Sequence, residues 1–258
     1  MLENLAVVEI TETSDNYCVL CKKKTARRMN TLPVYHCSFC DVSYLEKFTD
    51  NETYCLDSAK TDKFMNIDIN TTMRLAINNV RGGFLEQCNV HLNGAPIKIL
   101  DVGCGAGTFL DYAKDKGFAT YGCDICERSV KYVKNKGHNC FVSAIDNFTF
   151  AYNFFDVITL FDSFEHVNNP ILVLQRIYKS LKDSGHIIIS TPLRPETMTE
   201  SWRHFRPDEH NFYFNRKSLH YLCDAAGFKI IAENLDESKV RVDVNNPENI
   251  ITIIGEKC

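Results

Sequence analysis

The stretch Ile97-Lys98-Ile99-Leu100-Asp101-Val102-Gly103-Cys104-Gly105-Ala106-Gly107-Thr108 decides the fold of this 258-residue chain. An apolar strand runs directly into three alternating glycines, Gly103, Gly105 and Gly107. Glycine permits a sharp turn and leaves room for a ligand against the backbone, and the N–H groups that open the next helix favour an anionic group. The stretch therefore predicts a loop that holds a nucleotide-like cofactor between a strand and a helix.

The spacing of the glycines separates two classes of cofactor. The dinucleotide-binding pattern G-x-G-x-x-G would need its third glycine at position 108, where this chain has Thr108, whereas its third glycine is Gly107. The pattern G-x-G-x-G, preceded by Asp101 and Val102, resembles motif I of the class I S-adenosylmethionine-dependent methyltransferases. The resemblance covers roughly residues 70–258, and it implies that S-adenosylmethionine (SAM) is the cofactor.

Strand and helix patterns alternate downstream of this loop, with a period of about 20 residues. The apolar runs that predict strands lie at 120–125, 140–144, 154–161, 186–191, 228–233 and 249–255. The run 154–161 is apolar almost throughout, as expected for a parallel strand buried on both faces, and the last two runs predict a closing hairpin. We therefore expect an α/β fold with a Rossmann-like, seven-stranded, doubly wound sheet that carries an antiparallel edge strand.

Four cysteines near the N-terminus fall into two C-x2-C pairs. Cys18 and Cys21 form the first pair and Cys37 and Cys40 the second, with 15 residues between the pairs. This spacing is typical of a zinc ribbon, in which four thiolates bind one tetrahedral Zn²⁺. A site with four protein ligands leaves no open position for chemistry, so we expect the zinc to be structural.

These patterns divide the chain into three segments. Residues 1–60 contain the cysteine pairs, and residues 71–90 carry the apolar spacing of a helix. We expect a zinc-ribbon-like module over 1–60, a small helical cap over 61–96 and a SAM-binding methyltransferase domain over 97–258.

The resemblance also implies a set of cofactor contacts in this chain. The glycine loop and Thr108 would hold the methionine end of SAM, with Asp101 near its amino group. Asp124 lies near the end of the next strand, where a carboxylate can accept hydrogen bonds from both ribose hydroxyls. Asp146 would meet the adenine amine, and Ile145 would line the adenine ring.

The complete expected cofactor set is Asp101, Gly103, Gly105, Gly107, Thr108, Asp124, Ile125, Ile145, Asp146 and Phe161. For the glycine loop, the alternative is a tight turn that binds no ligand. For Asp124 and Asp146, the alternative is a solvated acid in a turn.

Residues that could act on the acceptor follow the strand predicted at 154–161. Ligands of open α/β sheets bind at the carboxyl ends of the strands, and Asp162, Glu165 and His166 lie there. Glu165-His166 resembles the E-H motif of the branch that includes ubiquinone-biosynthesis O-methyltransferases and many sugar methyltransferases. The segment 202–214 resembles the lid of the same branch, many of whose members also carry an N-terminal ribbon.

A hydroxyl acceptor benefits from a general base that works near neutral pH, and histidine meets this need. We rank His210 first as the base, followed by His166 and His204, with Asp162 or no dedicated base as the remaining options. The competing interpretation of His210 is a lid histidine that only bonds backbone or substrate, and Glu165-His166 has a competing structural interpretation in its loop.

Composition and charge narrow the class of protein. The formal net charge of −4 argues against broad nucleic-acid binding, which depends on phosphate neutralisation by Lys and Arg. No apolar run approaches the roughly 20 residues of a membrane span, and Met1-Leu2-Glu3-Asn4 lacks the order of a signal peptide. We expect a cytoplasmic enzyme without a membrane partner.

The resemblance also implies a class of acceptor. We expect methyl transfer to a hydroxyl of a small polar molecule that is phosphorylated or nucleotide-linked, such as a nucleotide-linked sugar or a glycan precursor. One alternative is an RNA methyltransferase that docks through the ribbon, whose short basic run includes Lys22, Lys23 and Lys24. The other is a non-catalytic SAM-binding partner protein. The sequence gives no prediction of the oligomeric state.

Overall fold

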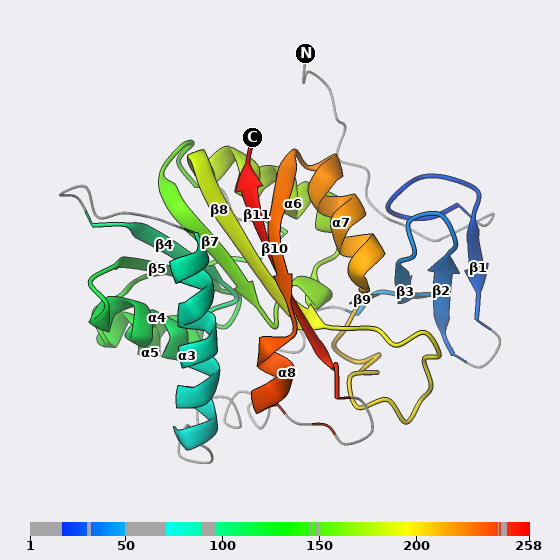
Figure 1. Cartoon of the computed structure of the whole chain (residues 1–258), viewed down its shortest axis with the longest axis horizontal. Coiled ribbons are helices and arrows are strands. Elements are labelled where there is room, and N and C mark those ends of the chain that lie inside the picture. Colours follow the sequence, from blue (N-terminus) through cyan, green and yellow to red (C-terminus); the bar gives the residue numbers. More distant parts are fainter. Residues whose placement is uncertain are drawn as a thin grey trace.

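The computed structural model describes residues 17–29, 32–49, 71–88, 96–144, 146–147, 150–241, 243 and 247–258. These residues form a seven-stranded sheet with helices packed against it and a smaller four-stranded sheet. In Figure 1 the small sheet, mostly blue, stands beside the large sheet and its helices.

The large sheet has the strand order β10-β11-β8-β7-β4-β5-β6. Its strands are β4 (Lys98–Val102), β5 (Ala119–Asp124), β6 (Asn139–Val142), β7 (Phe155–Phe161), β8 (Leu181–Pro192), β10 (Phe228–Asn234) and β11 (Ile250–Lys257). Strands β6, β5, β4, β7 and β8 are parallel, and β11 is antiparallel to β8. The edge strand β10 pairs antiparallel with β11, so the predicted Rossmann-like sheet and its closing hairpin are confirmed.

Helices connect and flank these strands. In the described residues they are α3 (Thr71–Gln87), α4 (Thr108–Asp115), α5 (Glu127–Asn135), α6 (Pro170–Ser180), α7 (Arg216–Ala225) and α8 (Asp236–Val240), together with the 3-10 turn η2 (Phe164–His166). Pro170 occupies the first helical position of α6, and the Asn169 side chain accepts a hydrogen bond from the Leu172 N–H, as N-terminal capping predicts. Among the helices that the structure describes, none is long and apolar enough to cross a bilayer.

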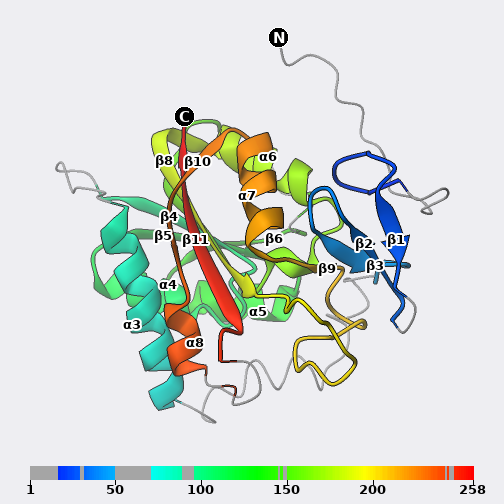
Figure 2. The same ribbon diagram turned by 45° about the vertical axis from the view of Figure 1, so that its right-hand side comes forward.

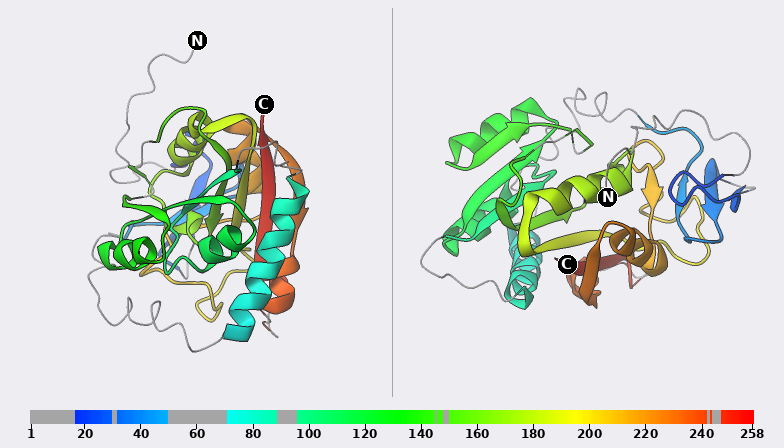
Figure 3. Two further views of the ribbon diagram at one scale, coloured as in Figure 1. Left: turned by 90° about the vertical axis from the view of Figure 1, so that its left-hand side faces the viewer. Right: turned by 90° about the horizontal axis from the view of Figure 1, so that it is seen from above.

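The strand period of two divides the core between the two faces of the sheet. In β8, Ile187 and Ile189 pack with α6 and α7, whereas Ile188 packs with Phe84 of α3 and Phe109 of α4. All five of these side chains are buried. Views from the side and from above show the helices on either side of the sheet (Figure 3). Both faces of the central strands are therefore covered, which explains their nearly continuous apolar sequence.

Strand β8 begins earlier than the sequence predicts. The expected strand is 186–191, but β8 already starts at Leu181, which pairs with Phe155 of β7. Helix α6 therefore ends at Ser180, directly before the strand. Leu181 has extended backbone angles, φ −73° and ψ 141°, which end the helix before it.

The small sheet has the order β1-β2-β3-β9. Strands β1 (Ala26–Arg28), β2 (Val34–Cys37) and β3 (Ser43–Leu45) come from the cysteine-containing segment, and β9 (Phe212–Tyr213) comes from the segment 202–214. The register pairs Ser43 with Tyr213 and Tyr44 with Phe212. Figure 2 shows β9 beside the blue strands. The sequence predicted no strand within 202–214, so this pairing is new.

Helices α3 and α4 approach each other closely at one glycine. A Cβ on Gly82 would lie 2.6 Å from Cε1 of Tyr112 in α4, a distance that would force the ring to move. A Cβ on the neighbouring Gly83 would meet nothing within 4 Å. Helices α3 and α4 can therefore pack this closely because Gly82 has no side chain.

We predict opposite effects for alanine at these two positions. Gly82→Ala should lower the free energy of unfolding by about 1–3 kcal/mol, because the new methyl group overlaps the Tyr112 ring. Gly83→Ala should raise the free energy of unfolding by about 0.5–1 kcal/mol, because alanine is the better helix former and its methyl group meets open space. Urea unfolding measures both, and equal effects would contradict the packing of α3 on α4.

Candidate functional site

The glycine loop leaves β4 at the carboxyl edge of the sheet. Gly103, Gly105 and Gly107 have φ values of 79°, 50° and 71°, which favour glycine. A Cβ on Gly107 would lie 2.9 Å from Cγ2 of Val133, whereas a Cβ on Gly105 would meet nothing within 4 Å. Helix α4 then begins at Thr108 without a side-chain cap. An open loop face and an uncapped helix start fit the carboxylate end of a small ligand.

Asp101 is buried near the end of β4, next to this loop. Its Oδ1 accepts a 2.7 Å hydrogen bond from Oγ1 of Thr159 in β7. Burial raises the pKa of Asp101 to about 6. A bound ammonium group would favour the charged carboxylate, which is the contact that the sequence predicts for Asp101.

Asp124 ends β5 and faces the same loop. Its Oδ2 accepts a 2.8 Å hydrogen bond from the Gly105 N–H, and its Oδ1 accepts a 2.9 Å bond from the Cys126 N–H. The Ile125 N–H also interacts with this carboxylate, which offers about four lone-pair sites in all. Asp124 thus fixes the loop and keeps acceptor capacity for a hydroxyl donor.

The other expected cofactor residues lie in different surroundings. Ile125 lies in the turn after β5, and Phe161 ends β7 with its ring 4.7 Å from that of Phe109. Asp146 accepts hydrogen bonds of 2.9–3.1 Å from the Asn168 and Asn169 N–H groups, so its carboxylate organises the start of α6. Ile145 lies outside the described residues.

The loop after β7 lies directly against the glycine loop. Strands β4 and β7 are adjacent and parallel, and Oγ of Ser163 donates a 2.7 Å hydrogen bond to the Val102 carbonyl. The structure therefore brings the expected cofactor loop and the segment from Asp162 to His166 together at one edge of the sheet.

Asp162 belongs to a cluster of four charges. Its carboxylate accepts hydrogen bonds from Arg81 of α3 at 2.9 Å and from Arg241 at 2.6 and 2.8 Å. Glu237 of α8, fully buried, accepts bonds from Arg81 at 3.0 and 3.2 Å and pairs with Arg241 at 2.9 Å. Burial opposes ionisation of Asp162, but Arg241 and Arg81 hold its pKa below the usual range. Asp162 is therefore a poor general base.

Glu165, His166 and His210 form a second cluster, whose side-chain nitrogen and oxygen atoms lie within 4.8 Å of one another. Nδ1 of His166 donates to the Glu209 carbonyl at 2.7 Å, and Nδ1 of His210 donates to the His204 carbonyl at 3.0 Å. Because a carbonyl only accepts, each neutral ring carries its proton on Nδ1 and keeps Nε2 as an acceptor. Atoms this close to one another can surround a cation.

Burial changes the acidity of this cluster. It raises the pKa of Glu165, whose Oε2 accepts a 2.9 Å hydrogen bond from Thr191, to about 8. It lowers the pKa of His210 to about 2 and that of His204 to about 4, and it also lowers the pKa of His166. Only 4% of His210 is exposed, whereas His166 is partly exposed. The structure thus favours His166 over His210 for direct contact with an acceptor.

The sequence interpretation missed Arg81, Glu237, Arg241 and Thr191. Each lies far along the chain from Asp162 and Glu165, on α3, α8, the turn after α8 and β8. No local pattern reports such pairs. The sequence shows only that Arg81, Glu237 and Arg241 are charged and that Thr191 ends a predicted strand.

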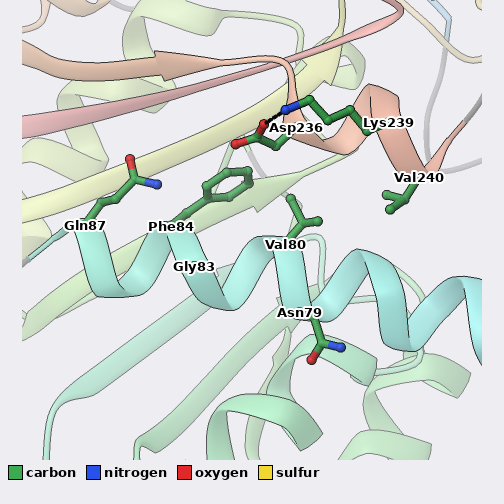
Figure 4. A pocket seen from close by; sticks show the side chains of 8 residues that line it. All are labelled: Asn79, Val80, Gly83, Phe84, Gln87, Asp236, Lys239 and Val240. Atoms are coloured by element: carbon green, nitrogen blue, oxygen red, sulfur yellow. Dashed lines mark hydrogen bonds and ion pairs between the residues drawn. The ribbon is translucent and has the colours of Figure 1, made fainter.

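A cavity of about 380 Å³ lies apart from this site, between α3 and α8. Figure 4 shows Val80 and Phe84 of α3 facing Lys239 and Asp236 of α8, which form an ion pair with each other. None of the expected cofactor or catalytic residues lines this cavity, so we assign it no role in the site.

The four cysteines of the N-terminal pairs converge. The sulfur atoms of Cys18 and Cys40 are 3.6 Å apart, and those of Cys21 and Cys37 are 3.7 Å apart. All four sulfur atoms lie within 4.8 Å of one another. A tetrahedral zinc with Zn–S bonds of ~2.3 Å needs sulfur atoms separated by about 3.8 Å. The cysteine geometry therefore fits one tetrahedral metal ion.

Comparison with known proteins places this geometry among methyltransferases. A family model described as a methyltransferase domain matches residues 80–233, more than half of the chain. The ubiquinone biosynthesis O-methyltransferase of Idiomarina loihiensis is 31% identical over 153 residues, which cover 57% of this chain and 62% of that relative. The chain thus spans less than two thirds of the length of this curated relative.

Solved structures share the fold at low sequence identity. A SAM-dependent methyltransferase from Archaeoglobus fulgidus has a TM-score of 0.58 and 20% identity over 76% of this chain and 99% of that one. A phosphoethanolamine N-methyltransferase from Haemonchus contortus, solved with S-adenosylhomocysteine, has a TM-score of 0.57 and 17% identity over 69% of this chain and 52% of that one. With the match over residues 80–233, this chain belongs to the methyltransferase domain family.

Proposed function

We propose that the protein transfers the methyl group of SAM to a hydroxyl of a small polar acceptor, such as a nucleotide-linked sugar or a glycan precursor. The observation that carries this proposal is the contact between the open glycine loop and the loop that bears Glu165 and His166. Membership of the methyltransferase domain family supports SAM as the donor, and the O-methyltransferase name of the matched relatives supports an oxygen acceptor.

The proposed residues on the donor side bind SAM and orient its methyl group. When bound, SAM supplies a methyl group on a positively charged sulfur, which leaves without needing an acid. The glycine loop and the start of α4 would hold the carboxylate of its methionine part, Asp101 the amino group and Asp124 the ribose hydroxyls. Much of the rate then comes from holding the acceptor oxygen in line with the methyl group.

We propose His166 as the residue that takes the proton of the acceptor hydroxyl. Its Nδ1–H is held by the Glu209 carbonyl, so its Nε2 is the proton acceptor. His210 packs edge-on against it, with ring centroids 4.9 Å apart. Burial lowers the pKa of His210 to about 2 and also lowers that of His166, so the choice of His166 rests on its partial exposure, whereas His210 is buried. His204 lies outside the cluster with Glu165, and burial lowers its pKa to about 4.

Transfer of labelled methyl groups tests the proposed activity. The protein is incubated with tritiated SAM and with separate fractions of small metabolites and of RNA from its host. Label in the small-metabolite fraction, on an oxygen, is the expected result. Label in RNA would favour the nucleic-acid alternative, and label in neither fraction would favour a non-catalytic binding protein.

The convergence of the four sulfur atoms supports one structural zinc bound by Cys18, Cys21, Cys37 and Cys40. Metal analysis should find one zinc per chain, and Cys37→Ser/Cys40→Ser should carry none and melt at a lower temperature, because metal binding contributes folding free energy. Cys258→Ser changes an exposed cysteine and should keep the zinc. Zinc retained by the double variant would contradict the assignment.

Asp124→Ala should weaken SAM binding by about 1.5–3 kcal/mol, or roughly 10–150-fold in Kd, the range for hydrogen bonds to a charged group. Isothermal titration calorimetry measures the Kd. Asp115→Ala changes an exposed acid at the end of α4 and is the matched control, with the Kd expected to stay unchanged. An unchanged Kd for a folded Asp124→Ala protein would place the ribose elsewhere.

His166→Ala should lower the rate of label transfer by about 10²–10⁴, the contribution of a general base, while the Kd of SAM stays nearly constant. The assay uses the metabolite fraction that accepts label from the unchanged protein. His220→Ala changes an exposed histidine of α7 that pairs with Glu233, and it should alter neither quantity. A larger loss in His210→Ala than in His166→Ala would return the role of base to His210.

A further inference from the structure

Asn211 joins two parts of the molecule that are far apart in sequence. It is fully buried and stands between His210 and strand β9. A buried amide is expensive unless its donors and its acceptor are paired. In Asn211, the side-chain oxygen, the side-chain nitrogen, the backbone N–H and the backbone carbonyl all have partners.

One set of partners belongs to the cysteine-containing segment. The Leu45 N–H donates to the Asn211 carbonyl at 2.9 Å. The Thr49 N–H and Oγ1–H donate to Oδ1 of Asn211 at 2.8 and 3.0 Å. Leu45 ends β3, the strand that starts three residues after Cys40, so these bonds reach Asn211 directly from the part of the chain that the four sulfur atoms organise.

The other set belongs to the turn that follows β7. The Asn211 N–H donates to the Glu165 carbonyl at 2.9 Å. Nδ2 of Asn211 donates to the His166 carbonyl at 3.2 Å and to Oδ1 of Asn168 at 3.0 Å. Asn211 therefore fixes the backbone of both Glu165 and His166, the two members of the acidic and histidine cluster in this turn.

A second connection runs in parallel with the first. Asp41, which follows Cys40 directly, accepts a 2.7 Å hydrogen bond from Arg194 just after β8. The Arg194 N–H in turn donates to the Phe214 carbonyl at 2.7 Å. The cysteine-containing segment is thus attached on both sides of β9, and Asn211 is the attachment that contacts the candidate catalytic turn.

We propose that Asn211 is a positioning residue through which the cysteine module, residues 17–49 in the described part of the chain, holds Glu165, His166 and His210 in their working arrangement. Metal occupancy of the cysteine module then sets the order of the acceptor side of the site, whereas the donor side at β4 and β5 does not depend on it. This inference rests on the proposed function, since it assigns the cysteine module a role in that site.

The first test measures the tautomers of the histidines and hydrogen exchange, and it does not measure methyl transfer. In protein with ¹⁵N-labelled histidine, Asn211→Ala should move His166 and His210 out of the single Nδ1–H tautomer, and hydrogen exchange of residues 164–168 should accelerate about tenfold, as loss of a buried hydrogen bond predicts. Zinc content and the Kd of SAM should remain those of the unchanged protein. Ser43→Ala is the matched control, because Ser43 is equally buried in β3 and its side chain bonds His36 within the cysteine module.

The second test removes the metal with a chelator from the 258-residue chain. Zinc removal should shift the same histidine signals and accelerate the same exchange in the unchanged protein, but it should add little to either change in Asn211→Ala, because the connection is already broken. Equal shifts in both proteins would overturn the proposal, as would unchanged histidine signals and exchange in Asn211→Ala.

If Asn211→Ala fails to bind SAM, Thr49→Val tests the proposal in its place. It removes only the Oγ1–H bond to Asn211 and leaves the backbone bond of residue 49, so smaller shifts of the same signals are expected, and none would overturn the proposal. The histidine signals and the hydrogen exchange can be measured without an acceptor. Absence of methyl transfer would contradict the proposed function, but these two measurements would still test the positioning role of Asn211.

Discussion

The parallel pairing of β4 with β7 is the constraint on which the rest of the site depends. Parallel neighbours end at the same edge of a sheet, so the loops after Val102 and Phe161 must lie side by side, and the Ser163–Val102 hydrogen bond joins them. A donor held by the first loop and an acceptor held by the second would then meet without any further movement of the strands. The strands are buried on both faces, which makes this relation between the loops rigid.

Local patterns were enough to predict the sheet, the glycine loop and the convergence of the cysteines. The positive φ values at Gly103, Gly105 and Gly107 and the short sulfur–sulfur distances follow from residues close in sequence. Pairing of β9 with β3 and the ion pairs of Asp162 with Arg81 and Arg241 join residues far apart in sequence, and no local period reports them. The catalytic ranking changed for the same reason, because the burial of His210 depends on tertiary packing.

Neighbouring charges and burial give the two acids that follow β7, Asp162 and Glu165, opposite pKa shifts. Asp162 is neutralised by two arginines and loses the capacity to act as a base, while Glu165, three residues further on, bonds to Thr191 and has its pKa raised by burial to about 8. Proton uptake is thereby favoured at Glu165 and disfavoured at Asp162, whereas burial lowers the pKa of the neighbouring His166 and His210. The arginines also connect α3 and α8, so this division of acidity and the closure of that side of the fold come from the same ion pairs.

The small sheet explains why a cysteine module and a methyltransferase fold occur as one structural unit. Three short strands bury too little apolar surface to be stable without a metal or a partner. Strand β9 supplies a fourth strand, and the apolar side chains of Met198, Trp202 and Tyr213 pack with Leu32 and Val34. The residues 198–214 gain their order from the same contacts. His210 packs against Tyr213 of this core, and Asn211 bonds to Leu45 and Thr49, so the proposed acceptor side is joined directly to the small sheet.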